Sequence, residues 1–217
     1  LALVSMPGGD AAAKEPWRMA LAYLAKAEIK EIPARLTAAA APHQIDFVER
    51  MIRNDISCPK TSSMGRLFDA VAALIGIRFV NTFEGQAAME LEQIADTSEE
   101  KNYAFSIVDD AGLKRIDFSP MISEICLDLR NEIPASAISM KFHRTAAAAL
   151  ARAAGLAKKR SNAVCLSGGS FQNEILLSLV KKMLVDEGFA VYTHSLVPPN
   201  DGGIALGQAA IAAHVNS

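Results

Sequence analysis

One short stretch, Ala163-Val-Cys-Leu-Ser-Gly-Gly-Ser-Phe-Gln-Asn173, predicts a strand, a turn and the start of a helix. The apolar run from Ala163 to Leu166 has the length of a buried strand. The run breaks at Gly168-Gly169 and gives way to a helical pattern, so backbone N–H groups can converge on an anion where the helix begins. Asn173 adds an amide donor and acceptor near anything bound at this turn.

A second turn of the same kind lies in Val197-Pro-Pro-Asn-Asp-Gly-Gly-Ile-Ala-Leu-Gly207. Asn200 is a natural helix N-cap, and Asp201 lies where unpaired helix N–H groups stabilise a carboxylate. The two glycines after Asp201 leave room for that carboxylate to reach a bound cation. Two turns suited to phosphate and one carboxylate together suggest a nucleotide and a metal ion.

Both turns also have purely structural interpretations. Glycine is required for steric reasons wherever φ is positive, and an acid at a helix N-terminus is ordinary. One carboxylate does not make a metal site, because several ligands are needed. The residues of the two turns leave these alternatives open.

The whole chain reads as α/β, with a mainly helical part over residues 1–160 and a β-α-β-α part over 161–217 that faces the nucleotide. In the second part we expect strands at 163–166 and 189–192 and helices at 171–187 and 200–214. In the first part we expect helices at 16–29, after Pro33, after Pro42, and at 62–76, 86–94, 119–131 and 134–159, with one hairpin formed by 103–108 and 113–116.

Composition excludes several classes of protein. The 217 residues are 51% hydrophobic and 21% charged, which is typical of a globular chain with a substantial core. The formal net charge of −2 gives no footprint for nucleic acid, and the short basic cluster Lys158-Lys159-Arg160 is expected to end a helix. No apolar run is long enough for a membrane span.

The cysteines and histidines predict no site of their own. Three cysteines (Cys58, Cys126 and Cys165) without C-x-x-C spacing indicate neither a disulfide framework nor a zinc site, and they favour the cytoplasm. The four histidines (His43, His143, His194 and His214) lack metal-site spacing, so each is expected to be structural or exposed.

Asp69 is the only acidic residue in the helical pattern between Ser62 and Gly76. Its carboxylate can accept hydrogen bonds from ribose hydroxyls. Arg66, three residues earlier on the same helix, offers a surface ion pair instead. The residue types do not decide between these two roles.

Five motifs in this order resemble the C-terminal part of the HypF carbamoyltransferases of [NiFe]-hydrogenase maturation. They are Pro7-Gly-Gly-Asp10 with Glu15-Pro-Trp-Arg-Met-Ala20, Thr61-Ser-Ser-Met-Gly-Arg-Leu-Phe-Asp-Ala70, Phe83-Glu-Gly-Gln-Ala-Ala88, and the two C-terminal turns. The resemblance spans nearly the whole chain. It implies a helix-rich lobe of the actin-like, RNase H-like ATPase fold that is similar to threonylcarbamoyl-transfer proteins, with a helical insertion and a small hairpin.

The resemblance also implies a reaction and a site. Carbamoyl phosphate and ATP would give carbamoyl-adenylate, whose carbamoyl group passes to the C-terminal cysteine of the partner HypE. Asp69 would hold the ribose, Gly85, Gly168, Gly169 and Asn173 would approach the nucleotide, and Asp201 would bind a divalent metal ion of unidentified kind. No residue of this chain is identified as catalytic, because the nucleophile would belong to HypE.

The chain departs from the family pattern in what it lacks. In the family, a histidine pair binds the metal together with the aspartate that corresponds to Asp201, and this chain lacks that pair. It also lacks the acylphosphatase, zinc-finger and adenylate-forming segments. Because the sequence begins with Leu1 and not with Met, we expect a fragment of a cytoplasmic protein. We expect this fragment to be inactive by itself. Two alternatives remain, an O-carbamoyltransferase acting on a small molecule and a non-catalytic module that docks a partner protein.

Overall fold

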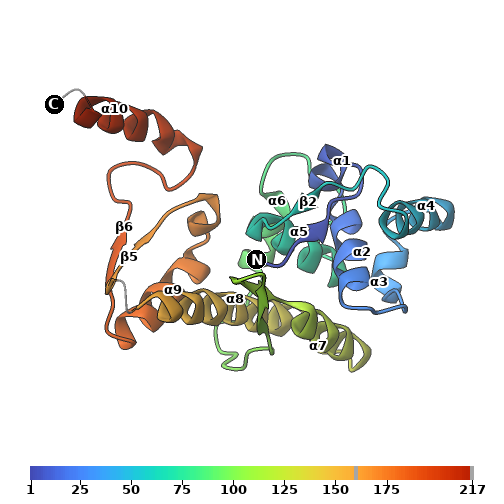
Figure 1. Ribbon diagram of the computed structural model, residues 1–217. Coiled ribbons are helices and arrows are strands. Elements are labelled where there is room, and N and C mark those ends of the chain that lie inside the picture. Colours follow the sequence, from blue (N-terminus) through green and yellow to red (C-terminus); the bar gives the residue numbers. More distant parts are fainter. Residues whose placement is uncertain (159–160, 216–217) are drawn as a thin grey trace. The chain divides into compact units, whose positions relative to one another are not determined.

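The computed structural model describes residues 1–158 and 161–215 of a mixed α/β chain that is mainly helical, as the sequence predicts. The chain forms two compact units, Leu1–Thr145 (unit 1) and Ala146–Ser217 (unit 2). The division between them falls inside helix α8 (Ala135–Ala157), and each unit is described by itself. Most helices and several strands of the two units are labelled in Figure 1. The expected boundary after residue 160 lies beside residues 159–160, which are outside the described part.

Unit 1 is built mainly from helices. They are α1 (Asp10–Lys14), α2 (Pro16–Lys26), α3 (Ala34–Thr37), α4 (Pro42–Arg53), α5 (Met64–Leu74), α6 (Gln86–Gln93), α7 (Ser119–Arg130) and the first part of α8. Its strands are β1 (Val4–Ser5), β2 (Lys60–Thr61), β3 (Ser106–Asp110) and β4 (Leu113–Asp117). The expected helices and the hairpin are present, and most boundaries lie within a few residues of those predicted.

The core of unit 1 forms where α2 and α5 lie side by side (Figure 1). Every residue of α5 from Leu67 to Leu74 is buried. Alanines at 70, 72 and 73 keep this helix thin, so α2 can approach it closely. Phe68 extends the core to α8 by an edge-on contact with Phe142, whose ring centre is 4.7 Å away.

Two pairs of strands border this helical core. The β3–β4 hairpin turns at Ala111-Gly112, both with positive φ (51° and 85°), which suits a tight two-residue turn. The antiparallel pairing of β1 with β2, which joins Val4 to Thr61, was not predicted. Each of these strands has only two residues, too few to show an alternating pattern.

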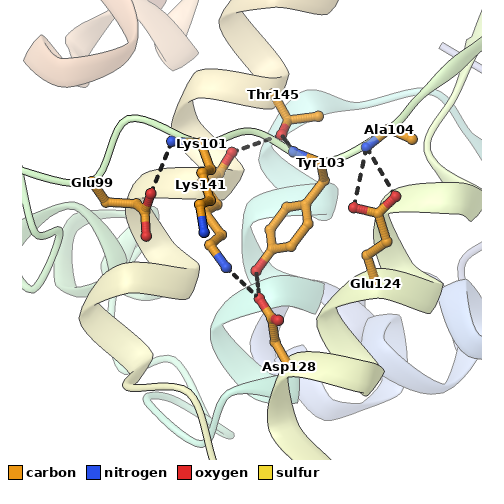
Figure 2. A network of polar contacts seen from close by, with 8 residues as sticks. All are labelled: Glu99, Lys101, Tyr103, Ala104, Glu124, Asp128, Lys141 and Thr145. Atoms are coloured by element: carbon orange, nitrogen blue, oxygen red, sulfur yellow. Dashed lines mark hydrogen bonds and ion pairs between the residues drawn. The ribbon is translucent and has the colours of Figure 1, made fainter. Parts of the chain in front are cut away.

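A buried polar network ties the segment before β3 to α7 and α8 (Figure 2). The Tyr103 hydroxyl donates to Asp128 Oδ2 at 2.7 Å, and Lys141 Nζ donates to the same oxygen at 2.9 Å. The Tyr103 backbone N–H donates to Thr145 Oγ1 at 2.8 Å. Burial and the hydrogen bond to the Asp128 carboxylate raise the pKa of the Tyr103 phenol, so the neutral hydroxyl remains the donor.

We expect Tyr103→Phe to lower the free energy of unfolding by about 1–2 kcal/mol, because a buried hydrogen bond to a charged acceptor is lost. The Asp128–Lys141 ion pair remains in this variant. Chemical denaturation measures the loss, with Tyr192→Phe, whose tyrosine is 60% exposed, as the matched control. Equal stability of the two variants would contradict the importance of this network.

Unit 2 follows the predicted β-α-β-α order. It contains β5 (Ala163–Leu166), the 3-10 turn η1 (Gly169–Gln172), α9 (Glu174–Asp186), β6 (Ala190–Thr193), η2 (Asp201–Gly203) and α10 (Ile204–Val215). The strands β5 and β6 run parallel, with Leu166 opposite Thr193 at their carboxyl ends. The helix expected from Phe171 begins at Glu174 instead, because a 3-10 turn comes first.

The two ends of unit 2 differ in their contacts. After α8 ends at Ala157, the Lys158 ammonium lies 4.9 Å from the centre of the Phe189 ring, and Lys159 and Arg160 lie outside the described residues. No residue of α10 is buried, although its sequence is apolar on every face. Its exposed large side chains are Ile204, Leu206, Ile211 and Val215.

Candidate functional site

The two glycine-containing turns predicted from the sequence lie against each other in unit 2. The Gly168 N–H donates to the Pro199 carbonyl at 2.8 Å. A Cβ added to Gly169 would lie 3.9 Å from the Asn200 Cβ, an ordinary contact distance. Both turns follow the carboxyl ends of parallel strands, the edge at which α/β sheets bind ligands.

Gly168 has a backbone conformation that other residues rarely adopt. Its φ is 108° and its ψ is 154°, a combination essentially confined to glycine. Nothing lies within 4 Å of a Cβ added there, so the requirement for glycine is conformational rather than steric. The open space leaves room for a ligand beside the turn.

Asn173 has a definite structural role. It is the N-cap of α9, and its Oδ1 accepts the Leu176 N–H at 2.7 Å. The residue is also buried. The predicted contact with a nucleotide stays a prediction, and any such contact has to coexist with this cap.

The second turn presents Asp201 to solvent. Asn200 caps η2 as expected, its Oδ1 accepting the Gly202 N–H at 3.0 Å, and Asp201 follows as an exposed residue. A Cβ at Gly202 would lie 2.9 Å from Pro198 Cγ, so this glycine allows the turn to close. Among the described residues no group of three His, Cys, Asp or Glu side chains is placed to hold a metal. Asp201 therefore fits one ligand of a cation and not a complete site.

One side-chain pair beside these turns was missed by the sequence analysis. His194 Nε2 and Ser167 Oγ lie within hydrogen-bonding distance, at 2.9 Å. Each is the first residue after its strand, and the register that pairs Leu166 with Thr193 brings the two together. Ser167 directly follows the strand predicted at 163–166, but the strand predicted at 189–192 ends two residues before His194, and the sequence predicts only a structural or exposed role for this histidine.

Asp69 lies in the core of unit 1, with 1% of its surface exposed. Arg66 Nη1 lies 2.8 Å from its Oδ2, so the ion pair expected at the surface exists but is buried. Neither of these two atoms has an aligned hydrogen bond among the described residues. Burial raises the pKa of the carboxyl to about 6, against the opposing effects of Arg66 and Asn81.

Asn81 connects Asp69 to the segment that carries Gly85. The Asn81 amide donates to Asp69 Oδ1 at 3.4 Å and to the Ala13 carbonyl at 3.0 Å. Its own oxygen accepts the Ala87 N–H at 3.2 Å, in the first turn of α6. Gly85 is the N-cap of that helix, with φ at 78° and no atom within 4 Å of an added Cβ.

The predicted site residues thus form two groups, one in each unit. Gly168, Gly169, Asn173 and Asp201 belong to the adjoining turns of unit 2. Asp69 and Gly85 belong to one polar cluster of unit 1, joined through Asn81.

We expect Gly168→Ala to lower the free energy of unfolding by about 1–3 kcal/mol, because alanine is strained in this conformation. Gly207→Ala is the matched control. It lies inside α10 with open space around it, and there alanine is favoured over glycine by about 1 kcal/mol. Denaturant unfolding compares the two, and an equal effect of both substitutions would contradict the assignment.

The raised pKa of Asp69 predicts a dependence of stability on pH. Folding favours the protonated carboxyl, so its contribution is fully present below the ordinary value of 3.8 and is lost as the pH rises through about 6. Relative to Asp69→Asn, the protein should lose about 2 kcal/mol of unfolding free energy between pH 4 and pH 7, at about 1.4 kcal/mol per pKa unit. Urea unfolding at both pH values measures this change.

The control for that measurement is Asp46→Asn, which removes a carboxylate paired with Arg50 on an exposed face of α4. A parallel pH dependence of the protein and of Asp69→Asn would show that the Asp69 carboxyl is not destabilised by burial.

Comparison with known proteins identifies the family. Residues 1–208 match the family model described as the second subdomain of the Kae1-like domain of carbamoyltransferases. The chain belongs to the HypF carbamoyltransferase family. It is 37% identical over 213 residues to the carbamoyltransferase HypF of Rhizobium leguminosarum bv. viciae, a match that covers 97% of this chain and 27% of that protein.

Other relatives agree with this family and fold. A carbamoyltransferase HypF homolog of Cupriavidus necator is 34% identical, over 96% of this chain and 55% of its own length. A crystal structure of full-length HypF in its phosphate- and nucleotide-bound form superposes with a TM-score of 0.90 at 39% identity, covering 99% of this chain and 28% of that chain. HypF of T. kodakarensis shares the fold, with a TM-score of 0.80.

The resemblance inferred from the five motifs and the predicted fold class are therefore confirmed. The chain spans about a quarter of the length of most HypF relatives that it matches. None of the helices in the described residues is both long and apolar enough to cross a membrane.

Proposed function

We propose that this chain supplies part of the carbamoyl-transfer site of a HypF-type enzyme. In the proposed reaction, carbamoyl phosphate and ATP form carbamoyl-adenylate, and the carbamoyl group passes to the C-terminal cysteine of a HypE-like acceptor during [NiFe]-hydrogenase maturation. The setting is the cytoplasm, and neither a membrane nor a nucleic acid takes part.

The hydrogen bond from Gly168 to the Pro199 carbonyl carries this proposal. It brings the two turns to one edge of the β5–β6 sheet, with Asn200 beside Gly169 and Asp201 next in the chain. The N–H groups of Gly168, Gly202 and Gly203 donate inside the turns. A bound anion would accept from the remaining amides at the start of η1. A phosphate group of the adenylate is the anion that the proposed reaction provides.

A solved relative supports the choice of ligand. The full-length HypF that superposes on this chain was crystallised with phosphate and nucleotide bound. By similarity, Gly168, Gly169 and Asn173 would approach the nucleotide from unit 2. Asp69 and Gly85 would act from unit 1, Asp69 toward the ribose.

For the ribose role, Asp69 would have to exchange a present partner for the sugar hydroxyls. Its carboxylate is almost fully covered, with Arg66 at one oxygen and Asn81 at the other. The Arg66 side chain is only 17% exposed, so the pair would open only if that side chain swung outward. Such a movement would uncover Asp69 Oδ2 for a hydroxyl donor.

Asp201 is proposed as one ligand of a divalent cation. A bound cation offsets negative charge on phosphate and carbonyl oxygens during acyl transfer. Because the described residues do not form a complete metal site, no step of the reaction is derived through the ion.

Nucleotide binding by a chain of full family length that carries this sequence tests the proposal. Asn173→Asp keeps an oxygen for the α9 cap but adds a negative charge, so binding of ATP should weaken at least about tenfold, or 1.4 kcal/mol. Asp201→Asn should weaken metal-dependent binding by a similar factor. Asp186→Asn, an exposed change at the end of α9, is the control and should leave binding unaltered.

Acceptor assays separate this function from its two alternatives. Transfer to a small alcohol and not to a terminal cysteine would favour an O-carbamoyltransferase. Unchanged transfer after both Asp201→Asn and Asn173→Asp would favour a module that only docks a partner. Calorimetry and carbamoyl-transfer rates provide both readouts.

A further inference from the structure

The side chains of Ser167 and His194 form a pair that the proposed reaction has not yet used. Both lie at the carboxyl edge of the parallel strands β5 and β6, one residue beyond the Leu166–Thr193 pair. Ser167 directly precedes Gly168, the residue that joins the two turns. The pair therefore borders the place at which the carbamoyl group is proposed to react.

The pair is exposed, and one of its ring nitrogens is already engaged. His194 Nε2 lies 2.9 Å from Ser167 Oγ, and among the described residues Nδ1 has no hydrogen-bond partner. When Nε2–H donates to the serine oxygen, Nδ1 carries the lone pair. In that tautomer the imidazole can accept a proton at Nδ1, and the contact with Ser167 holds the ring in place.

The register of the strands explains why this geometry is stable. Successive side chains of a strand point to opposite faces, so Ser167 shares a face with Cys165, and His194 shares a face with Tyr192. Cys165 and Tyr192 are register partners, and both are exposed, so this face of the two-stranded sheet is open.

The proposed reaction requires a proton acceptor at this place. When the acceptor thiol attacks carbamoyl-adenylate, a sulfur–carbon bond forms and the bond from the carbamoyl carbon to the phosphate oxygen breaks. AMP leaves with that electron pair, and the thiol proton has to go to a base. The exposed imidazole of His194, at the edge of the turns in unit 2, is placed to take this proton.

We propose that His194 accepts the proton of the attacking thiol and that Ser167 positions its ring. This inference rests on the proposed function and names the residue that activates the acceptor. His194 is the proton-accepting residue, whereas Ser167 acts through it as a positioning residue.

Acceptors that differ only in the ionisation of their nucleophile test the inference. In a chain of full family length, His194→Gln keeps an N–H for Ser167 and removes the base. Transfer to an acceptor with a terminal cysteine should fall about 100-fold, which is the usual range for loss of a general base. Transfer to the same acceptor with selenocysteine should fall much less, because a selenol is already ionised at neutral pH.

Ser167→Ala should lower transfer to the cysteine acceptor by a smaller factor, because the ring loses the partner that orients it. His43→Asn, a change of an exposed histidine in the first turn of α4, is the matched control and should have no effect. Release of pyrophosphate, which reports adenylate formation, should be unchanged in all three variants, and equal denaturant unfolding of the variants shows that they are folded.

The outcomes separate the inference from the function on which it rests. An unmodified enzyme that neither releases pyrophosphate nor carbamoylates the acceptor overturns the proposed function and this inference with it. An active enzyme in which His194→Gln slows the cysteine and selenocysteine acceptors equally, or slows neither, overturns only the role of His194.

Discussion

A backbone hydrogen bond between two turns, from Gly168 N–H to the carbonyl of Pro199, sets the geometry of unit 2 at the carboxyl edge of the β5–β6 sheet. Both partners are restricted by their own chemistry. Gly168 holds a φ of 108°, and Pro198-Pro199 removes rotational freedom and two N–H donors from the second turn. The spacing between the turns is therefore fixed by main chain, so it depends little on which side chains surround it.

In unit 1, side chains rather than main-chain atoms hold the segments of the predicted site together. Asn81 contacts Asp69, the end of α1 and the first turn of α6, so one amide links three segments far apart in sequence. This arrangement costs more folding free energy than the backbone hydrogen bond of unit 2, because a carboxylate is buried inside an apolar core with Arg66 as its counter-charge. A buried carboxyl with a raised pKa is common at functional sites, which agrees with the role proposed for Asp69.

Local pattern predicted much of this structure, and it failed where a feature depended on distant partners. The glycine turns, the N-cap Asn200 and the β-α-β-α order were foreseeable, because each is encoded by neighbouring residues. The pairing of β1 with β2 and the burial of Asp69 could not be predicted in this way, because both depend on contacts between segments that are distant in sequence. The capping bond of Asn173 shows the same limit, because its residue type suits a cap and a ligand equally well.

The apolar surface of α10 affects how this chain behaves in a test tube. Ile204, Leu206, Ile211 and Val215 all contact water, and apolar area in water favours self-association. That tendency strengthens with warming and with sulfate or phosphate salts. Preparations of this sequence are thus best kept dilute, cold and in chloride buffers. Crystallisation screens rich in ammonium sulfate will favour aggregation over crystal growth.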